Sequence, residues 1–140
     1  MRDFSELGVD FSQFKILVVD DVPVNLMLIE KFLQPYKFKI IKANNGKVAM
    51  EQLHNEKPDL MVLDVTMPEM DGTAVVKAVR AEGNGLPIII MSAFNSENDT
   101  RELLALGAAD FVAKPVIRER IVNTVINNTA YVVLARMNKK

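Results

Sequence analysis

The sequence contains no cysteine and a single histidine, His54, among its 140 residues. The absence of cysteine excludes disulfide bonds, cysteine-ligated zinc and a thiol nucleophile. One histidine argues against a histidine-rich metal site and against a serine–histidine triad. Whatever chemistry the chain performs must therefore come from other side chains.

The sequence also lacks an excess of charge of either sign, since 17 basic residues balance 18 acidic ones for a net charge of −1. The broad positive surface of a nucleic-acid-binding protein is missing, so direct nucleic-acid binding is not expected. No apolar run approaches membrane-spanning length, and the first residues are too polar for a signal peptide. We expect a soluble, cytoplasmic protein without membrane contact.

Length and composition predict one globular domain, because 49% of the residues are hydrophobic and 25% are charged. We assign this domain to residues 15–140 and treat residues 1–14 as an N-terminal extension. Four apolar residues of the extension share helical spacing, namely Phe4, Leu7, Phe11 and Phe14. The extension is then either a short amphipathic helix packed on the domain or on a partner, or a linker remnant.

Short apolar runs alternate with segments of helical spacing along the domain. The runs are residues 16–19, 39–43, 60–63, 88–91 and 111–113, and the helical segments are 24–34, 47–54, 73–81, 96–106 and 117–137. Three runs are apolar throughout, which is typical of parallel strands buried on both faces. Lys39 and Lys42 mark the second run as an edge strand. The alternation predicts an α/β domain with right-handed crossovers.

Two of the predicted helices have defined apolar positions. The first carries Val24, Met27, Leu28 and Leu33, and the last carries a stripe of Ile117, Ile121, Val125, Asn128 and Val132. These stripes are the faces expected to pack on the sheet.

Carboxylates lie at the ends of two predicted strands. Asp20 and Asp21 follow the first run and Asp64 ends the third. Ligands of open parallel sheets bind beyond the carboxyl ends of the strands, where the strand order reverses. Three carboxylates at one point repel one another unless a cation is present, and oxygen ligands without imidazole favour Mg²⁺. The sequence therefore predicts a Mg²⁺ site at Asp20, Asp21 and Asp64.

Two further strand ends carry groups that suit a phosphoryl group. Ser92 closes the fourth strand with a hydroxyl, and Lys114 closes the fifth with an ammonium. A metal and an ammonium neutralise the charge on phosphoryl oxygens during transfer. Asp64 is central, and a carboxylate can form an acyl phosphate, so Asp64 is the predicted nucleophile.

These motifs, in this order, resemble the receiver domain of two-component response regulators, the CheY-like family. The matching segments are KILVVDD with Pro23 and Asn25, LMVLDVTMPEMDG, PIIIMSA and GAADFVAKP. The resemblance covers about residues 15–137. It implies a flavodoxin-like fold, with a five-stranded parallel sheet in the order 2-1-3-4-5 and helices on both faces.

The resemblance also implies roles for individual residues. Asp64 is the phosphoacceptor, which takes a phosphoryl group from a sensor histidine kinase or a His-phosphotransfer protein. Asp20, Asp21 and Asp64 bind Mg²⁺ together with the main-chain carbonyl of Thr66. Lys114 pairs with the phosphoryl oxygens and precedes a cis peptide bond to Pro115.

Ser92 and Phe111 are the switch residues that the resemblance implies. Phosphorylation draws both inward and changes the surface of the fourth helix, fifth strand and fifth helix for an unidentified effector. A homodimer through the same surface is a further expectation. Phe94, two residues after Ser92, is expected to shield the acyl phosphate from water.

Two other functions fit part of the pattern. A pseudo-receiver that only docks a partner typically lacks an acidic residue or the lysine, and this sequence has both. A Mg²⁺-dependent phosphatase of the haloacid-dehalogenase type needs a second acid at the position of Thr66. We therefore expect a switch that phosphorylates and dephosphorylates itself, not a turnover enzyme, with His54 as a surface residue.

Overall fold

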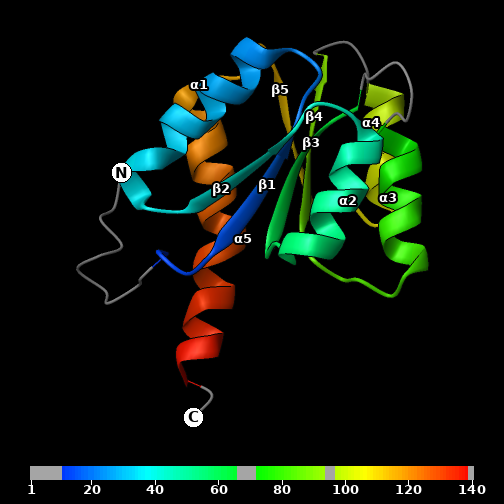
Figure 1. Cartoon of the computed structure of the whole chain (residues 1–140). Coiled ribbons are helices and arrows are strands. Elements are labelled where there is room, and N and C mark those ends of the chain that lie inside the picture. Colours follow the sequence, from blue (N-terminus) through cyan, green and yellow to red (C-terminus); the bar gives the residue numbers. More distant parts are fainter. Residues whose placement is uncertain (1–10, 66–71, 94–96, 139–140) are drawn as a thin grey trace.

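The structure is a computed structural model, and it describes residues 11–65, 72–93 and 97–138 (Figure 1). Strands and helices alternate along the described chain. In order, the elements are β1 (Lys15–Val19), α1 (Pro23–Leu33), the 3₁₀ helix η2 (Gln34–Tyr36), β2 (Lys39–Ala43), α2 (Gly46–Glu56), β3 (Leu60–Asp64), α3 (Gly72–Ala81), β4 (Ile88–Ala93), α4 (Glu97–Ala105), β5 (Asp110–Lys114) and α5 (Arg118–Asn138). The strands and α-helices lie within two residues of the predicted bounds at each end.

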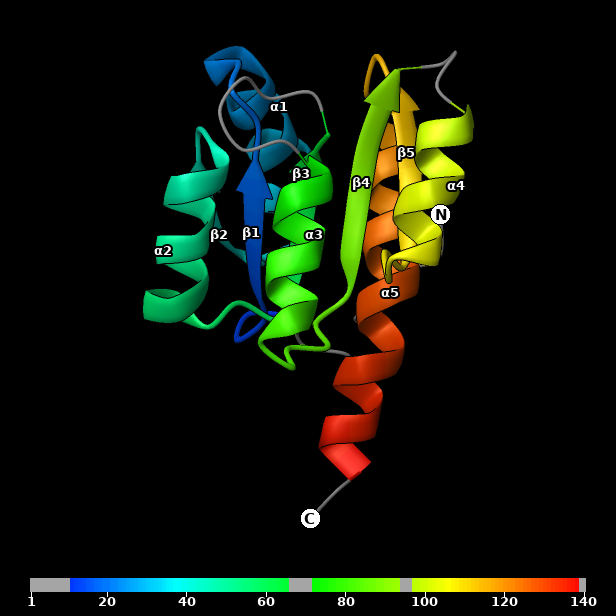
Figure 2. The ribbon, with the colours of Figure 1, turned by 90° about the vertical axis from the view of Figure 1, so that its right-hand side faces the viewer.

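The five strands form one parallel sheet in the order β2-β1-β3-β4-β5, as predicted. α1 and α5 cover one face of the sheet, and α2, α3 and α4 cover the other (Figures 1 and 2). The fold is thus the flavodoxin-like α/β sandwich that the sequence predicted. The order of the strands reverses between β1 and β3, so their carboxyl ends border a crevice.

Burial along the strands follows from their places in the sheet. All five residues of the central strand β3 are buried, because helices cover both of its faces. Lys39 and Lys42 of β2 are exposed, and β2 is an edge strand, as their charges predicted. The central strands therefore give the carboxyl edge of the sheet a rigid support.

The inward face of α1 differs from the prediction. Leu33 is buried, as predicted, but Val24, Met27 and Leu28 are exposed, and Leu26 and Ile29 are buried in their place. Apolar residues occur on both sides of this helix, so spacing alone could not select the face that packs on the sheet. The helix consequently presents an apolar ridge to solvent.

α5 is the longest helix, with 21 residues, and its last turns project beyond the amino ends of the strands (Figure 2). Ile121 and Val125 are fully buried, as predicted, whereas Ile117 precedes the helix and is exposed. Within the described residues, no helix combines the length and the apolarity that a membrane span requires.

The end of the predicted N-terminal extension belongs to the core. Phe11 and Phe14 are buried in the cluster under α1 and α5. The Phe14 N–H donates to the Phe11 carbonyl at 2.9 Å, so these residues form a turn where a helix was one of the predictions. The Phe38 ring lies 4.7 Å from that of Phe11 and 6.1 Å from that of Phe14. Phe4 and Leu7 lie outside the described residues.

Arg136 ties the last turns of α5 to this N-terminal turn. Its guanidinium lies 2.9 Å from a carboxylate oxygen of Asp59 and 5.5 Å from the centre of the Phe14 ring. The other Asp59 oxygen accepts a hydrogen bond of 2.8 Å from the Lys15 N–H. Arg136 thus links α5, the N-terminal turn and the segment that enters β3.

We expect Arg136→Ala to lower the free energy of unfolding by about 1 kcal/mol, since it removes one ion pair and one cation–π contact. Urea denaturation followed by far-UV circular dichroism measures this change. Arg120→Ala, which removes an exposed arginine from the same helix, is the matched control. Equal unfolding midpoints for the two variants would show that Arg136 contributes nothing to stability.

Candidate functional site

The fold brings together the three carboxylates that the sequence singled out. Asp20 follows β1 directly and Asp64 ends β3, and these strands are paired with Val19 opposite Leu63. Carboxylate oxygens of Asp20, Asp21 and Asp64 all lie within 4.8 Å of one another. Asp20 and Asp64 are buried, whereas Asp21 is exposed. The cluster therefore has one open side.

Lys114 supplies the positive charge of the site. Its Nζ lies 3.0 Å from Oδ1 of Asp64 and 3.7 Å from Oδ2 of Asp20. β4 separates β5 from β3, so the long lysine side chain reaches across one strand to the carboxylate. The peptide bond from Lys114 to Pro115 is cis, as the resemblance implied. The ammonium compensates part of the cost of burying Asp64.

Asp20 is held by the start of α1. Its Oδ1 accepts a hydrogen bond of 2.9 Å from the Val22 N–H, and its Oδ2 accepts one of 3.2 Å from the Asn25 side-chain amide. From the sequence, Asn25 is part of a matching motif but has no predicted role. The signal available in the sequence was an amide five residues after a strand-end aspartate, which places it on the first turn of the next helix.

Ser92 and Phe111 lie on the neighbouring strands β4 and β5. Ser92 is buried and lies opposite Ala113 in the sheet, one residue beyond Met91, which is paired with Asp64. Ser92 is therefore at the same edge of the sheet as the carboxylates. Phe111 is 46% exposed, so its ring faces outward in this conformation. Thr66 and Phe94 lie outside the described residues.

The single histidine, His54, is not among the residues of this site. His54 on α2 is exposed and lies 2.7 Å from a carboxylate oxygen of Glu82, which follows α3. The pair is a surface contact between α2 and the turn after α3. This agrees with the prediction of a surface histidine.

The donor set of the cluster suits a small divalent cation. Three carboxylates and one ammonium leave an excess of two negative charges at one point. Mg²⁺ prefers oxygen ligands and is commonly held by one or two carboxylates together with waters. Asp21, on the open side, and the two buried aspartates could hold such an ion without rearrangement of the sheet.

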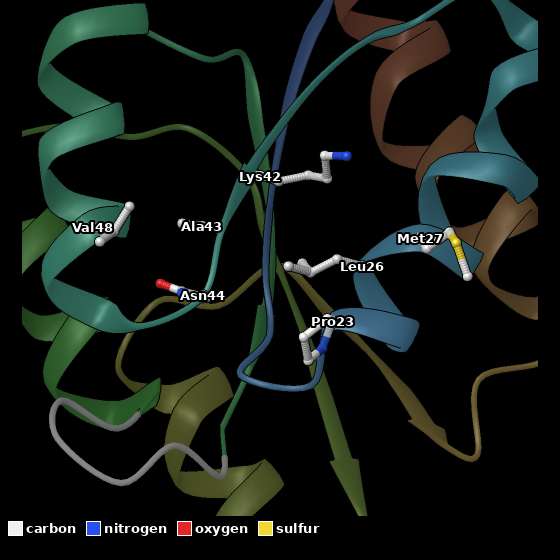
Figure 3. A pocket seen from close by; sticks show the side chains of 7 residues that line it. All are labelled: Pro23, Leu26, Met27, Lys42, Ala43, Asn44 and Val48. Carbon is white, nitrogen blue, oxygen red and sulfur yellow. The ribbon is translucent and has the colours of Figure 1, made fainter.

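Two hollows flank α1 next to the site. The first has a volume of about 330 Å³ and is lined by Pro23, Leu26, Met27, Lys42, Ala43, Asn44 and Val48 (Figure 3). The second, of about 130 Å³, lies on the other side of the helix and is lined by Asn25, Leu28, Ile29, Phe32, Lys114, Pro115 and Val116. The outer apolar ridge of α1 thus runs between two hollows, the second of which is lined by Asn25 and Lys114, the residues that contact Asp20 and Asp64.

Comparisons with known proteins agree with this site. The family model of the response regulator receiver domain matches residues 16–126. The chain is 34% identical over 116 residues to chemotaxis protein CheY of Bacillus subtilis, covering 82% of this chain and 96% of that protein. A solved structure of a two-component response regulator from Clostridium difficile has a TM-score of 0.78 and 28% identity, covering 91% of this chain and all of that one (100%).

Other relatives are much longer than this chain. The sensor histidine kinase GacS of Pseudomonas protegens is 34% identical over 120 residues, which are 82% of this chain but 13% of that protein. The transcriptional regulatory protein ZraR of Escherichia coli is 37% identical over 101 residues, or 23% of its length. The same kind of domain therefore occurs both in short proteins and as a part of kinases and transcriptional regulators.

The three carboxylates lie close together, so their mutual repulsion should lower the stability of the fold. In metal-free buffer, Asp21→Asn should raise the thermal unfolding midpoint, since it removes one of three mutually repelling charges. A gain of roughly 1 kcal/mol corresponds to a shift of about 2–4 °C for a domain of this size.

Mg²⁺ should raise the midpoint of the wild type more than that of the variant. Calorimetry with and without MgCl₂ measures both effects, and Glu51→Gln, on an exposed position of α2, is the control. A Mg²⁺-dependent rise of the same size in Asp21→Asn would exclude Asp21 as a ligand.

Proposed function

This chain belongs to the family of response regulator receiver domains, and we propose that it is a phosphoryl-accepting switch of a two-component phosphorelay. Asp64 takes the phosphoryl group from a phosphohistidine of a sensor histidine kinase or of a His-phosphotransfer protein. The observation that carries the proposal is the buried Asp64 carboxylate, which lies 3.0 Å from Lys114 and beside two further carboxylates. We place the domain in the cytoplasm, where the ATP that supplies such kinases is found.

The transfer step follows from the surroundings of Asp64. A carboxylate oxygen attacks phosphorus, the bond from phosphorus to the donor imidazole nitrogen breaks, and the imidazole leaves with the bonding electron pair. Lys114 neutralises the charge of the phosphoryl oxygens, and the burial of the site strengthens that interaction. Asp20 and Asp21 with Asp64 hold Mg²⁺, which when bound neutralises further phosphoryl charge.

The acyl phosphate changes the balance between two conformations. Ser92, at the same edge of the sheet, donates its hydroxyl to the phosphoryl group, and Phe111 turns from its exposed position into the space behind it. This alters the surface of α4, β5 and α5, to which a downstream effector or a second copy binds. Hydrolysis of the acyl phosphate restores the starting state, so the domain is a switch and not a turnover enzyme.

We expect incubation with acetyl phosphate and Mg²⁺ to add one phosphoryl group to the wild-type chain. Intact-mass spectrometry measures the adduct, and both Asp64→Ala and addition of EDTA should abolish it. A chain that gains no adduct, and whose spectrum beryllofluoride does not perturb, would be a pseudo-receiver that acts by docking alone.

A different result would favour the alternative function of a Mg²⁺-dependent phosphatase. Sustained release of phosphate from small phosphate esters would indicate a phosphatase of the haloacid-dehalogenase type. The sequence argues against it, because Thr66 occupies the position where that class carries its second acid.

The exposed ridge of α1 is the surface that we assign to the phosphodonor protein. The donor must bring its imidazole to Asp64, so it has to contact the surface around the carboxylate cluster. Val24, Met27 and Leu28 form an apolar helix face there, and the hollows on both sides can receive side chains of the donor. Figure 3 shows the hollow on the side of Met27. Apolar area of this kind next to a polar site is typical of a protein interface.

A charged substitution on this ridge should slow phosphorylation by a protein donor but not phosphorylation by a small-molecule donor. We expect Met27→Asp to slow phosphotransfer from a phosphorylated His-phosphotransfer domain at least about tenfold, the effect of 1.4 kcal/mol of lost binding energy. Phosphorylation by acetyl phosphate should be unchanged, because Met27 is not among the residues of the cluster.

The assay follows label transfer over time, with Leu104→Asp on α4 as a control at another exposed apolar position. If Met27→Asp accepts the group from the protein donor as fast as the wild type, the ridge is not the docking surface.

A further inference from the structure

We propose that Asn25 is a positioning residue for the cation site. Asn25 holds the Asp20 carboxylate in the orientation that a divalent cation requires. The inference rests on the proposed function, since it concerns the Mg²⁺ affinity of the same site. It adds a residue on α1 to the three carboxylates, and it links the orientation of Asp20 to the helix that presents the apolar ridge.

The two oxygens of Asp20 have separate anchors. Oδ1 accepts from the main-chain N–H of Val22, and Oδ2 accepts from the Asn25 side-chain amide at 3.2 Å. The terminal torsion of an aspartate is broad, so one hydrogen bond leaves the carboxylate free to rotate, whereas two bonds on opposite oxygens fix its plane. Asp20 is fully buried, and the fixed plane therefore determines which lone pairs face Asp21 and Asp64.

Lys114 does not perform this role for Asp20. Its Nζ lies 3.0 Å from Asp64 but 3.7 Å from Oδ2 of Asp20, beyond the usual length of a hydrogen bond. Asn25 is the residue that the structure gives as hydrogen-bond donor to that oxygen. Lys114 serves the acceptor carboxylate, and Asn25 serves the buried metal-binding one.

The chemistry of an amide suits this task. A lysine or arginine at the same place would also orient Asp20, but its charge would cancel the attraction of the site for a cation. A neutral amide occupies one lone pair of a carboxylate that has about four, and it leaves the negative charge intact. Asn25 therefore orients Asp20 without competing with the metal.

Helix formation does not explain the residue. Asn25 is the third residue of α1, where asparagine is a poorer helix former than alanine or leucine. No side chain caps this helix, and the Asn25 amide is directed to Asp20 instead. If Asn25 had only a local structural role, Asn25→Ala and Asn25→Leu would both favour α1.

The test compares Mg²⁺ affinity in the full chain for the wild type, Asn25→Ala and Asn25→Leu. Alanine removes the amide and its volume, whereas leucine keeps the volume and removes only the hydrogen bond. Isothermal titration calorimetry should show a Kd for Mg²⁺ at least fivefold higher in both variants. Asn127→Ala, an exposed asparagine on α5, should match the wild type.

A second readout reports on orientation without any metal. Hydrogen exchange of the Val22 N–H, which is bonded to the other Asp20 oxygen, should accelerate in both variants. The rate of phosphorylation by acetyl phosphate should fall at low Mg²⁺ and recover at saturating Mg²⁺, because the chemistry of Asp64 and Lys114 is intact. A defect in the phosphoryl chemistry itself would not be rescued by the metal.

The outcomes separate this inference from the proposed function. Unchanged Mg²⁺ affinity and unchanged Val22 exchange in both variants, with a phosphorylated wild type, would overturn the role of Asn25 alone. A wild type that binds no Mg²⁺ and accepts no phosphoryl group would overturn the proposed function and this inference with it.

Discussion

The ion pair between Asp64 and Lys114 is the interaction on which the rest of the site depends. A carboxylate that is 1% exposed is costly to keep charged, and the ammonium 3.0 Å away offsets much of that cost. The pair requires β3 and β5 to end at the same edge of the sheet, with one strand between them. The crossover connections of the fold meet this requirement, so the Asp64–Lys114 ion pair depends on the topology of the sheet.

Much of the fold and of the site could be predicted from the sequence, for a physical reason. Fully buried strands must be apolar throughout, so a charged residue at their ends is conspicuous, and parallel strands place all such ends at one edge. Asp20 and Asp64 were identified in this way, and Lys114 was identified from its place at the end of the fifth strand. Lys39 and Lys42 likewise revealed the edge strand, because charge is tolerated only where one side of the sheet is open.

The parts that could not be predicted depend on contacts between distant or ambiguous side chains. α1 is apolar on two sides, so its period did not reveal that Leu26 and Ile29 face the sheet. The contact of Arg136 with Asp59 and Phe14 joins three segments whose proximity only the folded chain determines. The bond from Asn25 to Asp20 depends on the rotation of one side chain, to which spacing is insensitive.

β3 connects the contacts of Asp59 at its start with the carboxylate cluster at its end. Asp59, just before the strand, is bonded to Arg136 of α5 and to the N–H of Lys15 in β1, while Asp64 ends the strand in the carboxylate cluster. Every residue between Leu60 and Asp64 is buried. The strand is therefore the fixed support beneath the carboxylates, whereas the edge strand β5 carries Phe111 with its side chain exposed to solvent.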